Sequence, residues 1–333
     1  MKYGARNKAG SAQPSAEPAR IIPGRAVLVP LALLFAAALA WSQSLYKYRG
    51  PDGEWIYTDR APPTSLRQVE VRELARGRKD PEVNVFHRIE GQDIILFASN
   101  DFYAPIELVL GLDELRNVSL PPADQPLRFV IPPQREMVLL TFTADDGVAT
   151  PLIAYRYQYL AGDPEAEHNP PGPYRVPYAI ASRYTVSQAY PYATTHTTSD
   201  AMYAVDISMP IGTNIYAARD GVVFEVASTN FKGGVDPEVD GDTANLIRIL
   251  HDDGTYAVYA HLNWNTIRVE PGDEVRRGQY IADSGNTGFS TGPHLHFAVI
   301  RNAGMKPESV PFSFEGPDRS EVTPERGQLL VAY

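Results

Sequence analysis

The sequence predicts a mainly β protein made of several units with short strands. Its 333 residues include 29 prolines and 19 tyrosines, a composition typical of many short strands and turns rather than of long helices. Short apolar or alternating runs recur along the chain, and Gly, Pro, Asn and Asp separate them. The length is sufficient for two or more domains, each with its own core.

Residues 1–40 are predicted to be a secretory signal peptide or an N-terminal membrane anchor. They hold the one long apolar run, at 26–40, which follows Arg20 and Arg25 and ends in small residues. The run is shorter than the ~20 residues needed to cross a bilayer, which favours the signal peptide. The long segment ahead of it keeps the uncleaved anchor open. In both cases the chain is expected to be exported, to the periplasm or the cell envelope.

Two short segments are expected next. Residues 41–64 are predicted to form a small β module, because aromatic runs lie on both sides of Pro51-Asp52-Gly53, a hairpin signal. Residues 65–82 are rich in charge and are predicted to be a solvated linker or a short helix.

Residues 83–160 are predicted to form an Ig-like antiparallel β-sandwich. Six short runs alternate with turn formers at regular spacing, as in sandwiches of this size. His87 lies in the first run without a partner motif, so we interpret it as structural. Residues 161–187 are polar and rich in proline at their start, and we expect a connector there. The six expected strands are 85–89, 94–98, 106–110, 127–131, 137–142 and 153–159.

The second half of the chain carries dense strand and turn signals. The runs 246–251 and 256–261 flank Asp252-Asp253-Gly254, which predicts a hairpin. Further on, His294 and His296 alternate with apolar residues after a turn-forming stretch. In a strand both imidazoles would share one face, ~6.5–7 Å apart, which suits a metal ligand with a second imidazole beside it. Two solvent-facing histidines would fit this pair equally well.

The set of motifs identifies the family that this half resembles. Asp206, the segments 217–223 and 259–262, and Gly-Pro-His-Leu-His-Phe at 292–297 resemble lysostaphin-type zinc metalloendopeptidases, which are bacterial peptidoglycan hydrolases. The resemblance covers about 188–301. It implies an antiparallel β metallopeptidase domain with a groove, placed at 188–310, and leaves 311–333 as a C-terminal tail.

The resemblance also implies the site residues. Asp206 and His296 match two of the family's zinc ligands, and His261 and His294 match its two catalytic histidines, which flank the metal without binding it. The family's other ligand usually lies four residues before the Asp, where this chain has Met202. Some members have a longer arrangement, which Gln188, Tyr190 and His196 fit, so His196 is the predicted third ligand.

The chemistry of these residues agrees with that assignment. Zinc hydrolases typically use three protein ligands and keep the fourth position open. The segment has no His-Glu-x-x-His helix, so it offers no glutamate base of the kind that such a helix carries. Imidazole titrates in the range needed for proton transfer. We therefore expect His261 and His294 to orient water, stabilise the oxyanion and protonate the leaving amine, in a division that the sequence leaves open.

The predicted function is that of an exported zinc endopeptidase that cleaves cross-bridge or stem peptides of peptidoglycan. Two other function classes compete with it. The first is an inactive copy of the fold that binds and activates a cell-wall amidase, which the departure at Met202 favours. The second is a biotinyl or lipoyl carrier, which we reject because residues 276–300 contain no lysine.

The expected partners follow from charge. The formal net charge is −10, and nothing suggests a basic surface for nucleic acid. Residues 1–40 carry five Lys/Arg and one Glu, so without them the charge is −14, which argues against electrostatic capture by an anionic envelope. A protein regulator in the envelope, or direct contact with peptidoglycan peptides, fits better. Two roles are considered for the sandwich. It would either position the enzyme on the cell wall or cover the groove and keep the enzyme latent.

Overall fold

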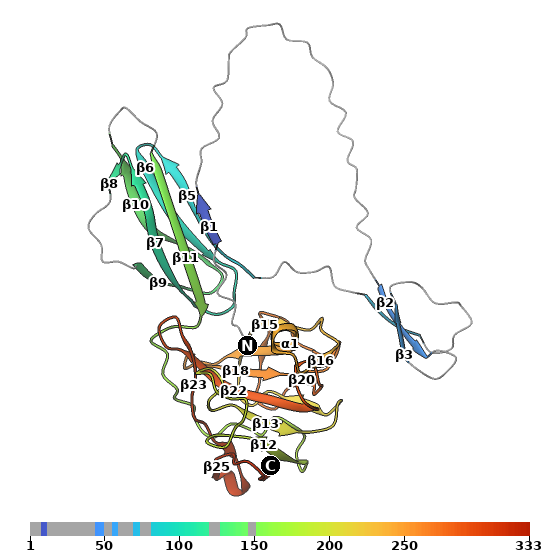
Figure 1. Ribbon diagram of the computed structural model, residues 1–333. Coiled ribbons are helices and arrows are strands. Elements are labelled where there is room, and N and C mark those ends of the chain that lie inside the picture. The colour runs from blue at the N-terminus through green and yellow to red at the C-terminus, as the bar shows by residue number, and fades with distance from the viewer. Residues whose placement is uncertain are drawn as a thin grey trace. The chain divides into compact units, whose positions relative to one another are not determined.

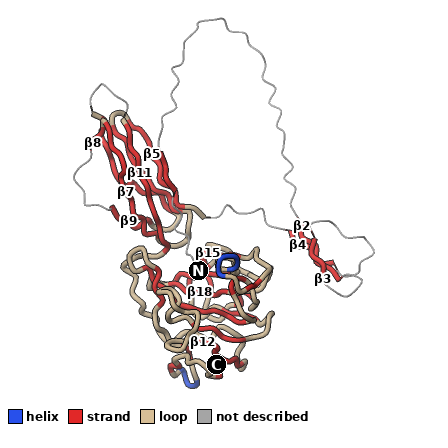
Figure 2. Tube along the Cα trace, viewed as in Figure 1, coloured by secondary structure: helices blue, strands red, loops and turns tan. Residues whose placement is uncertain are grey.

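The computed structural model describes residues 8–11, 44–49, 55–58, 69–73, 81–119, 127–145 and 151–333. Nearly all regular structure among them is strand (Figure 2), which confirms the mainly β prediction. The chain divides into two compact units: residues 14–81 form one, and residues 1–13 with 82–333 form the other. The apolar run at 26–40 lies outside the described residues. Within the described part, no helix has the length and apolarity to cross a membrane.

The smaller unit contains a three-stranded antiparallel sheet in the order β3-β2-β4. Strands β2 (Ser44–Arg49) and β3 (Trp55–Thr58) pair on either side of the predicted turn. Strand β4 (Val69–Glu73) pairs with β2 and lies where we expected a linker or a short helix. Val69 and Val71 alternate with charged residues there, and that period-two pattern suits a strand better than a helix.

A β-sandwich opens the larger unit. Its two four-stranded antiparallel sheets have the orders β1-β11-β7-β9 and β5-β6-β10-β8. Apolar residues of both sheets form one buried cluster, and Tyr155 Oη donates to Val85 O across it at 3.1 Å. An Ig-like relationship of this sandwich stays a prediction. The strands are β1 (Lys8–Ser11), β5 (Val83–Glu90), β6 (Asp93–Asn100), β7 (Ile106–Arg116), β8 (Val118–Ser119), β9 (Leu127–Ile131), β10 (Arg135–Ala144) and β11 (Leu152–Ala161).

A nine-stranded antiparallel sheet dominates the rest of this unit (Figure 1). Its order is β19-β15-β17-β18-β22-β13-β12-β26, with β23 paired to β22. The predicted hairpin is present, because β17 and β18 pair across Asp252-Asp253-Gly254. The strands of this sheet are β12 (Arg183–Gln188), β13 (Val205–Ser208), β15 (Gly221–Ala227), β17 (Leu246–Leu250), β18 (Tyr256–Ala260), β19 (Glu274–Val275), β22 (His294–Asn302), β23 (Pro307–Ser309) and β26 (Leu329–Val331).

Short elements surround this sheet. The two-stranded sheets pair β14 with β20, β16 with β21 and β24 with β25. One short α-helix and one 3-10 helix complete the described elements of this region. Their bounds are β14 (Asn214–Tyr216), β16 (Gly233–Gly234), α1 (Pro237–Asp240), β20 (Tyr280–Asp283), β21 (Gly288–Phe289), β24 (Phe314–Glu315), η1 (Pro317–Arg319) and β25 (Glu321–Val322).

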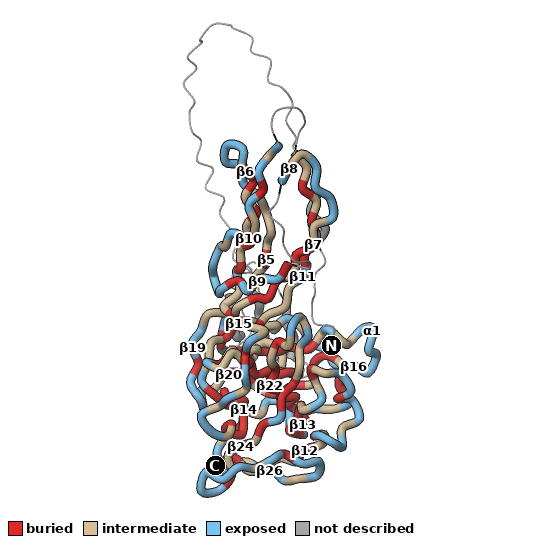
Figure 3. Tube along the Cα trace, turned by 90° about the vertical axis from the view of Figure 1, so that its left-hand side faces the viewer, coloured by how far each residue is buried: buried red, intermediate tan, exposed pale blue. Residues whose placement is uncertain are grey.

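The alternation along β22 sorts its residues between two faces of the sheet. Leu295, Phe297 and Val299 point into the main buried core, which Figure 3 shows as buried segments around the β22 label. Because side chains alternate in a strand, His294 and His296 share the opposite face. Ala298, on that same face, packs in a second buried cluster with residues of β18. The two histidines therefore lie at one end of a face that continues with the apolar residues Ala298 and Ile300.

The C-terminal segment is part of the sheet. We expected 311–333 to be a tail, but β26 pairs with β12, and Phe312, Phe314 and Leu330 are buried in the main core. The connector is also packed: Tyr174 and Tyr178 are buried in that core. These aromatic residues bury enough apolar surface to order segments that lack a clear strand period. The core of this region thus runs from the connector to the end of the chain.

The sandwich and the large sheet share contacts inside their common unit. The buried carboxylate of Glu107 in β7 accepts from Asn302 Nδ2 at 2.8 Å and from Met305 N at 2.6 Å. Phe102 and Tyr103 pack against the second buried cluster, which contains β18 and β22 residues. A buried carboxylate with several donors and an adjoining apolar contact join the two parts.

Candidate metal centre

Neighbouring strands bring Asp206 and His296 together. In the register of β13 and β22, Asp206 faces His296 directly. Side chains opposite each other in an antiparallel pair lie on the same face, at short range. His296 Nδ1 is 2.9 Å from Asp206 Oδ1, and both residues are buried. The sheet itself therefore fixes this pair.

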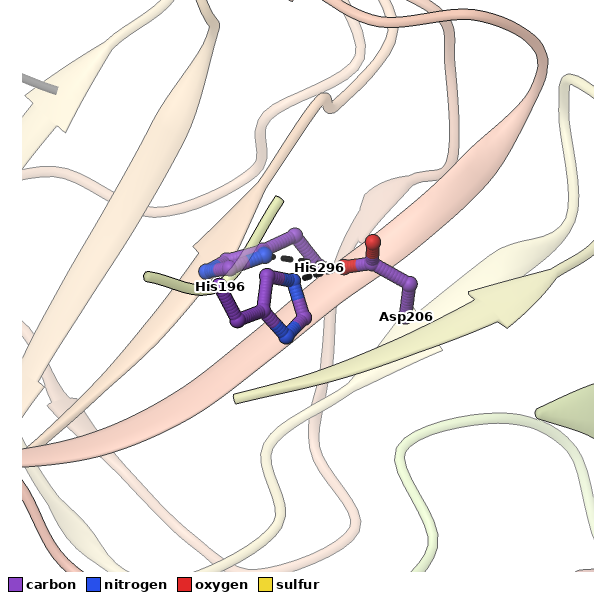
Figure 4. A group of neighbouring side chains, drawn as sticks. All are labelled: His196, Asp206 and His296. Atoms are coloured by element: carbon purple, nitrogen blue, oxygen red, sulfur yellow. Dashed lines mark hydrogen bonds and ion pairs between the residues drawn. The ribbon is translucent and has the colours of Figure 1, made fainter. Parts of the chain in front are cut away.

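His196 reaches the same carboxylate from the loop between β12 and β13. Its Nε2 lies 3.2 Å from Asp206 Oδ1, and its ring is nearly perpendicular to that of His296, with centroids 5.1 Å apart. Figure 4 shows both imidazoles turned toward one oxygen of Asp206. At the far end of the loop, Ser309 N donates to Ser199 O at 2.8 Å and Tyr203 N donates to Ser309 Oγ at 3.0 Å. These bonds anchor the loop to β23.

The three residues suit a tetrahedral zinc ion. Their ligand atoms all lie within 4.8 Å of one another, the one such group of His and acidic side chains found in the described part of the chain. With zinc bonds of about 2.0–2.1 Å, tetrahedral donors lie about 3.3 Å apart. The two donor pairs measured here, 3.2 Å and 2.9 Å, agree with that spacing. Two imidazoles and a carboxylate are also a usual zinc donor set.

The electrostatics of the group keep Asp206 ionised. Burial alone raises the pKa of this carboxyl, but hydrogen bonds from His196 and His296 and the charge of nearby imidazoles outweigh burial and hold the pKa well below its usual range. An ionised buried carboxylate needs a cationic or hydrogen-bonding partner. The group is therefore prepared to receive a cation.

His294 and His261 lie beside this group and face each other. Their ring centroids are 4.5 Å apart, and His294 Nε2 is 3.7 Å from Asp206 Oδ1. His261 follows β18 with a φ of 62°, in the left-handed region that non-glycine residues seldom adopt. Such strained residues gather at functional sites.

Backbone carbonyls set the tautomers of these two rings. His261 Nδ1 is 2.7 Å from Thr287 O, and His294 Nδ1 is 2.8 Å from Gly292 O. A carbonyl oxygen only accepts, so each Nδ1 carries the hydrogen and the neutral ring keeps a lone pair on Nε2. Burial and the neighbouring imidazoles lower the pKa of His261 to about 3. Its Nε2 is consequently an acceptor at neutral pH.

The other candidate positions do not join the site. Met202 is 42% exposed, and His87 lies in β5 of the sandwich. His251 donates from Nδ1 to Asp220 O at 2.7 Å, and His168 contacts Tyr174 Oη at 3.2 Å. The structure thus brings together all five predicted site residues and leaves these four apart.

Sequence reasoning missed several groups around the site. Gln188 hydrogen-bonds to Asp206, although the motif comparison gave it no role. Main-chain carbonyls orient His261 and His294. Every residue has a carbonyl, so the sequence does not indicate which ones make these contacts. Ser290 Oγ lies 3.3 Å from His294 Nδ1. Only the rich content of Gly, Ser and Thr in the turn before His294 could have suggested such contacts.

The part of the chain that contains most of the site matches a known protein family. Residues 200–307 match the model of peptidase family M23, so the chain contains a domain of this family. The matched range includes Asp206, His261, His294 and His296. His196 precedes it, at the point where the spacing departs from the usual pattern.

Two of the similar proteins are named as endopeptidases. Glycyl-glycine endopeptidase ALE-1 of Staphylococcus capitis is 39% identical over 102 residues, which are 30% of this chain and 25% of that protein. Peptidoglycan DD-endopeptidase ShyA of Vibrio cholerae is 33% identical over 126 residues, 37% of this chain and 26% of that protein. The chain therefore spans only about a quarter of these relatives' length.

Solved structures are also similar, and lysostaphin is one of them. Lysostaphin of Staphylococcus simulans is 32% identical over 38% of this chain and 47% of that chain, with a TM-score of 0.29. The family assignment rests on the sequence match.

Proposed function

We propose that this protein is a zinc-dependent endopeptidase that hydrolyses peptide bonds in peptidoglycan and acts in the periplasm or cell envelope. The observation that carries the proposal is the convergence of His196, Asp206 and His296 on one point, with His261 and His294 beside it. The relatives named above are peptidoglycan and glycyl-glycine endopeptidases by name. The apolar run at 26–40 supports export.

His196 Nε2, Asp206 Oδ1 and His296 Nδ1 would hold the ion. When bound, zinc polarises a carbonyl and lowers the pKa of water to about 7. The chain's own contribution is to fix donors and acceptors beside that position. The domain that holds these residues is proposed to extend from β12 to β26. This range is wider than the expected 188–310, because β12 and β26 are both strands of the large sheet.

His261 and His294 are proposed to handle the protons. Their Nε2 atoms are free of the backbone, since each Nδ1 is engaged by a carbonyl. The neutral His261 can accept a proton from the attacking water. A ring that has gained a proton can then stabilise the oxyanion or donate to the leaving amine. These steps need no glutamate base.

Digestion of purified peptidoglycan tests the proposal. The metal-stripped protein, reloaded with one equivalent of zinc, is incubated with sacculi containing direct cross-links and with sacculi containing glycyl bridges. Released muropeptides are identified by mass spectrometry. New peptide ends in either substrate support an endopeptidase and reveal the bond that is cut. Zinc binding without any cleavage contradicts it.

A parallel assay separates the enzyme from an amidase activator. The chain is added to a purified cell-wall amidase, and sugar-peptide cleavage is measured with and without it. An activator would raise that cleavage while releasing no peptide fragments by itself. Under our proposal, peptide fragments appear with no amidase present.

A further inference from the structure

A β-bulge in β12 turns Gln188 toward the metal centre. Thr185 pairs with Ser208 and Val186 with Ile207, so a regular ladder would place Gln188 opposite Val205. The register shifts between Val186 and Gln188, and Gln188 faces Asp206 instead. A bulge inserts one residue and re-aims the side chains that follow it.

The side-chain amide of Gln188 then connects two parts of the site. Its Nε2 donates to Asp206 Oδ2 at 2.6 Å and to Thr195 Oγ1 at 2.9 Å. Its Oε1 accepts from Thr194 N at 2.7 Å and from Thr195 N at 3.1 Å. Thr195 is the residue directly before His196. One amide therefore touches the ligand carboxylate and the backbone that carries a ligand imidazole.

The orientation of this amide follows from its partners. Backbone N–H groups only donate, so the atom that faces Thr194 and Thr195 must be the oxygen. The nitrogen must then face Asp206, which accepts through Oδ2. With Oδ2 engaged, Oδ1 is the oxygen left for His196, His296 and an ion. Gln188 thus selects which oxygen of the carboxylate faces the centre.

We propose that Gln188 is a positioning residue of this metal centre, which fixes the rotation of the Asp206 carboxylate and ties it to the loop that presents His196. The proposal rests on the function proposed above, because it assumes that the group binds zinc. It explains how a ligand ten residues before Asp206 can be held as firmly as one on the strand. Groups that orient ligands affect metal affinity by about 10–100-fold.

Zinc affinity of the metal-stripped full chain tests this role. We would measure it by competition with a chromogenic chelator for the wild type, Gln188→Ala and Gln188→Glu. The alanine variant loses both contacts. The glutamate variant keeps an acceptor for Thr194 N and Thr195 N but cannot donate to Asp206. Both are expected to bind zinc about 10–100-fold more weakly than the wild type.

Gln279→Ala is the matched control, because the Gln279 amide also accepts a turn N–H, from Arg276 at 3.1 Å, on another edge of the domain. It should keep wild-type affinity. The absorption spectrum of bound cobalt gives a second readout: both Gln188 variants should shift it, and the control should not. Thermal melts show whether each variant is folded. If the alanine variant does not fold, the glutamate variant alone tests the proposal.

Wild-type affinity and spectrum in either folded Gln188 variant would overturn the proposal, because one of the two contacts would then be dispensable. That result would leave the endopeptidase proposal intact. In contrast, a wild-type chain that binds zinc but cleaves no peptidoglycan would overturn the endopeptidase proposal and leave the positioning role of Gln188 standing.

Discussion

The rings of His261 and His294 lie 4.5 Å apart with an interplanar angle of 43°, one from the end of β18 and the other from the start of β22. The two strands are neighbours in the sheet, so their ends hold both imidazoles on one side of the ligand group. The proposed proton-transfer residues are therefore different from the proposed metal ligands, and the two roles can be tested separately.

Replacing either of these histidines should remove turnover and keep the metal. His261→Ala and His294→Ala are each expected to lower the rate of peptide release by 10²–10⁴-fold, which is the usual contribution of a positioned acid or base. Zinc content is measured by atomic absorption and turnover by muropeptide release. His168→Ala, which is outside the site, is the control. Near-normal turnover in a zinc-loaded His261 or His294 variant would refute the assigned role.

His196, rather than a residue near Met202, should be the third ligand. His196→Ala is expected to weaken zinc binding at least about 100-fold, since even an outer contact is worth 10–100-fold. Met202→Ala should bind zinc like the wild type, because Met202 is 42% exposed and apolar. Isothermal titration of metal-stripped protein measures both. Equal losses in the two variants would contradict the ligand assignment.

Zinc should stabilise the folded chain. A ligand at 100 times its Kd adds about 2.7 kcal/mol to the free energy of unfolding. We expect calorimetry to show a higher Tm with zinc than after chelation, and Asp206→Ala to abolish the difference. The structural basis would be that a loop, β13 and β22 each offer one ligand atom, all within 4.8 Å of one another. A zinc-dependent rise of Tm that persists in Asp206→Ala would place the ion elsewhere.

His251 should make stability depend on pH. Burial, the largest cause, and the nearby Arg219 together lower the pKa of His251 from 6.5 to about 4, against the hydrogen bond to Asp220 O, which raises it. The unfolded chain binds this proton more readily, so the stabilisation is complete above pH 6.5 and is lost as the pH falls toward 4. Between pH 7.5 and pH 5 the loss should be about 2 kcal/mol.

Urea unfolding of the chelated protein at these two pH values measures the effect. His251→Asn places an amide nitrogen near the donor position of Nδ1 and does not titrate, so its stability should vary less with pH. Other groups titrate equally in both proteins, and the difference isolates His251. Identical pH dependence in the two proteins would show that His251 is not the cause.

The contact between β7 and the end of β22 should stabilise the larger unit. Glu107→Ala removes the acceptor of Asn302 Nδ2 and Met305 N, in a residue that is 2% exposed. Leaving buried donors without that partner should cost roughly 1–3 kcal/mol. Glu114→Ala breaks an exposed pair with Arg116 and should cost less than about 1 kcal/mol. Chemical denaturation compares the two, and equal small losses would contradict the importance of this contact.

The sequence predicts the strands of the sandwich well, because alternation and turn residues are local signals. The site histidines are also predicted, since their motifs keep a recognisable order. The register shift that aims Gln188 and the left-handed backbone of His261 leave no local pattern. The aromatic residues of 311–333 looked like a tail, because only tertiary packing gives that stretch its order. The features that could not be predicted are those that depend on contacts between distant parts of the chain.

A main-chain oxygen lies within hydrogen-bond distance of Nδ1 in both His261 and His294, and at His294 the hydroxyl of Ser290 adds a longer contact of 3.3 Å. Every amino acid carries such an oxygen, so a point substitution in the turn that contributes them leaves both hydrogen-bond acceptors in place. At Gly292 an added methyl group would meet no neighbouring atom. The turn can therefore change its side chains while the Nδ1 edges of both imidazoles keep their orientation.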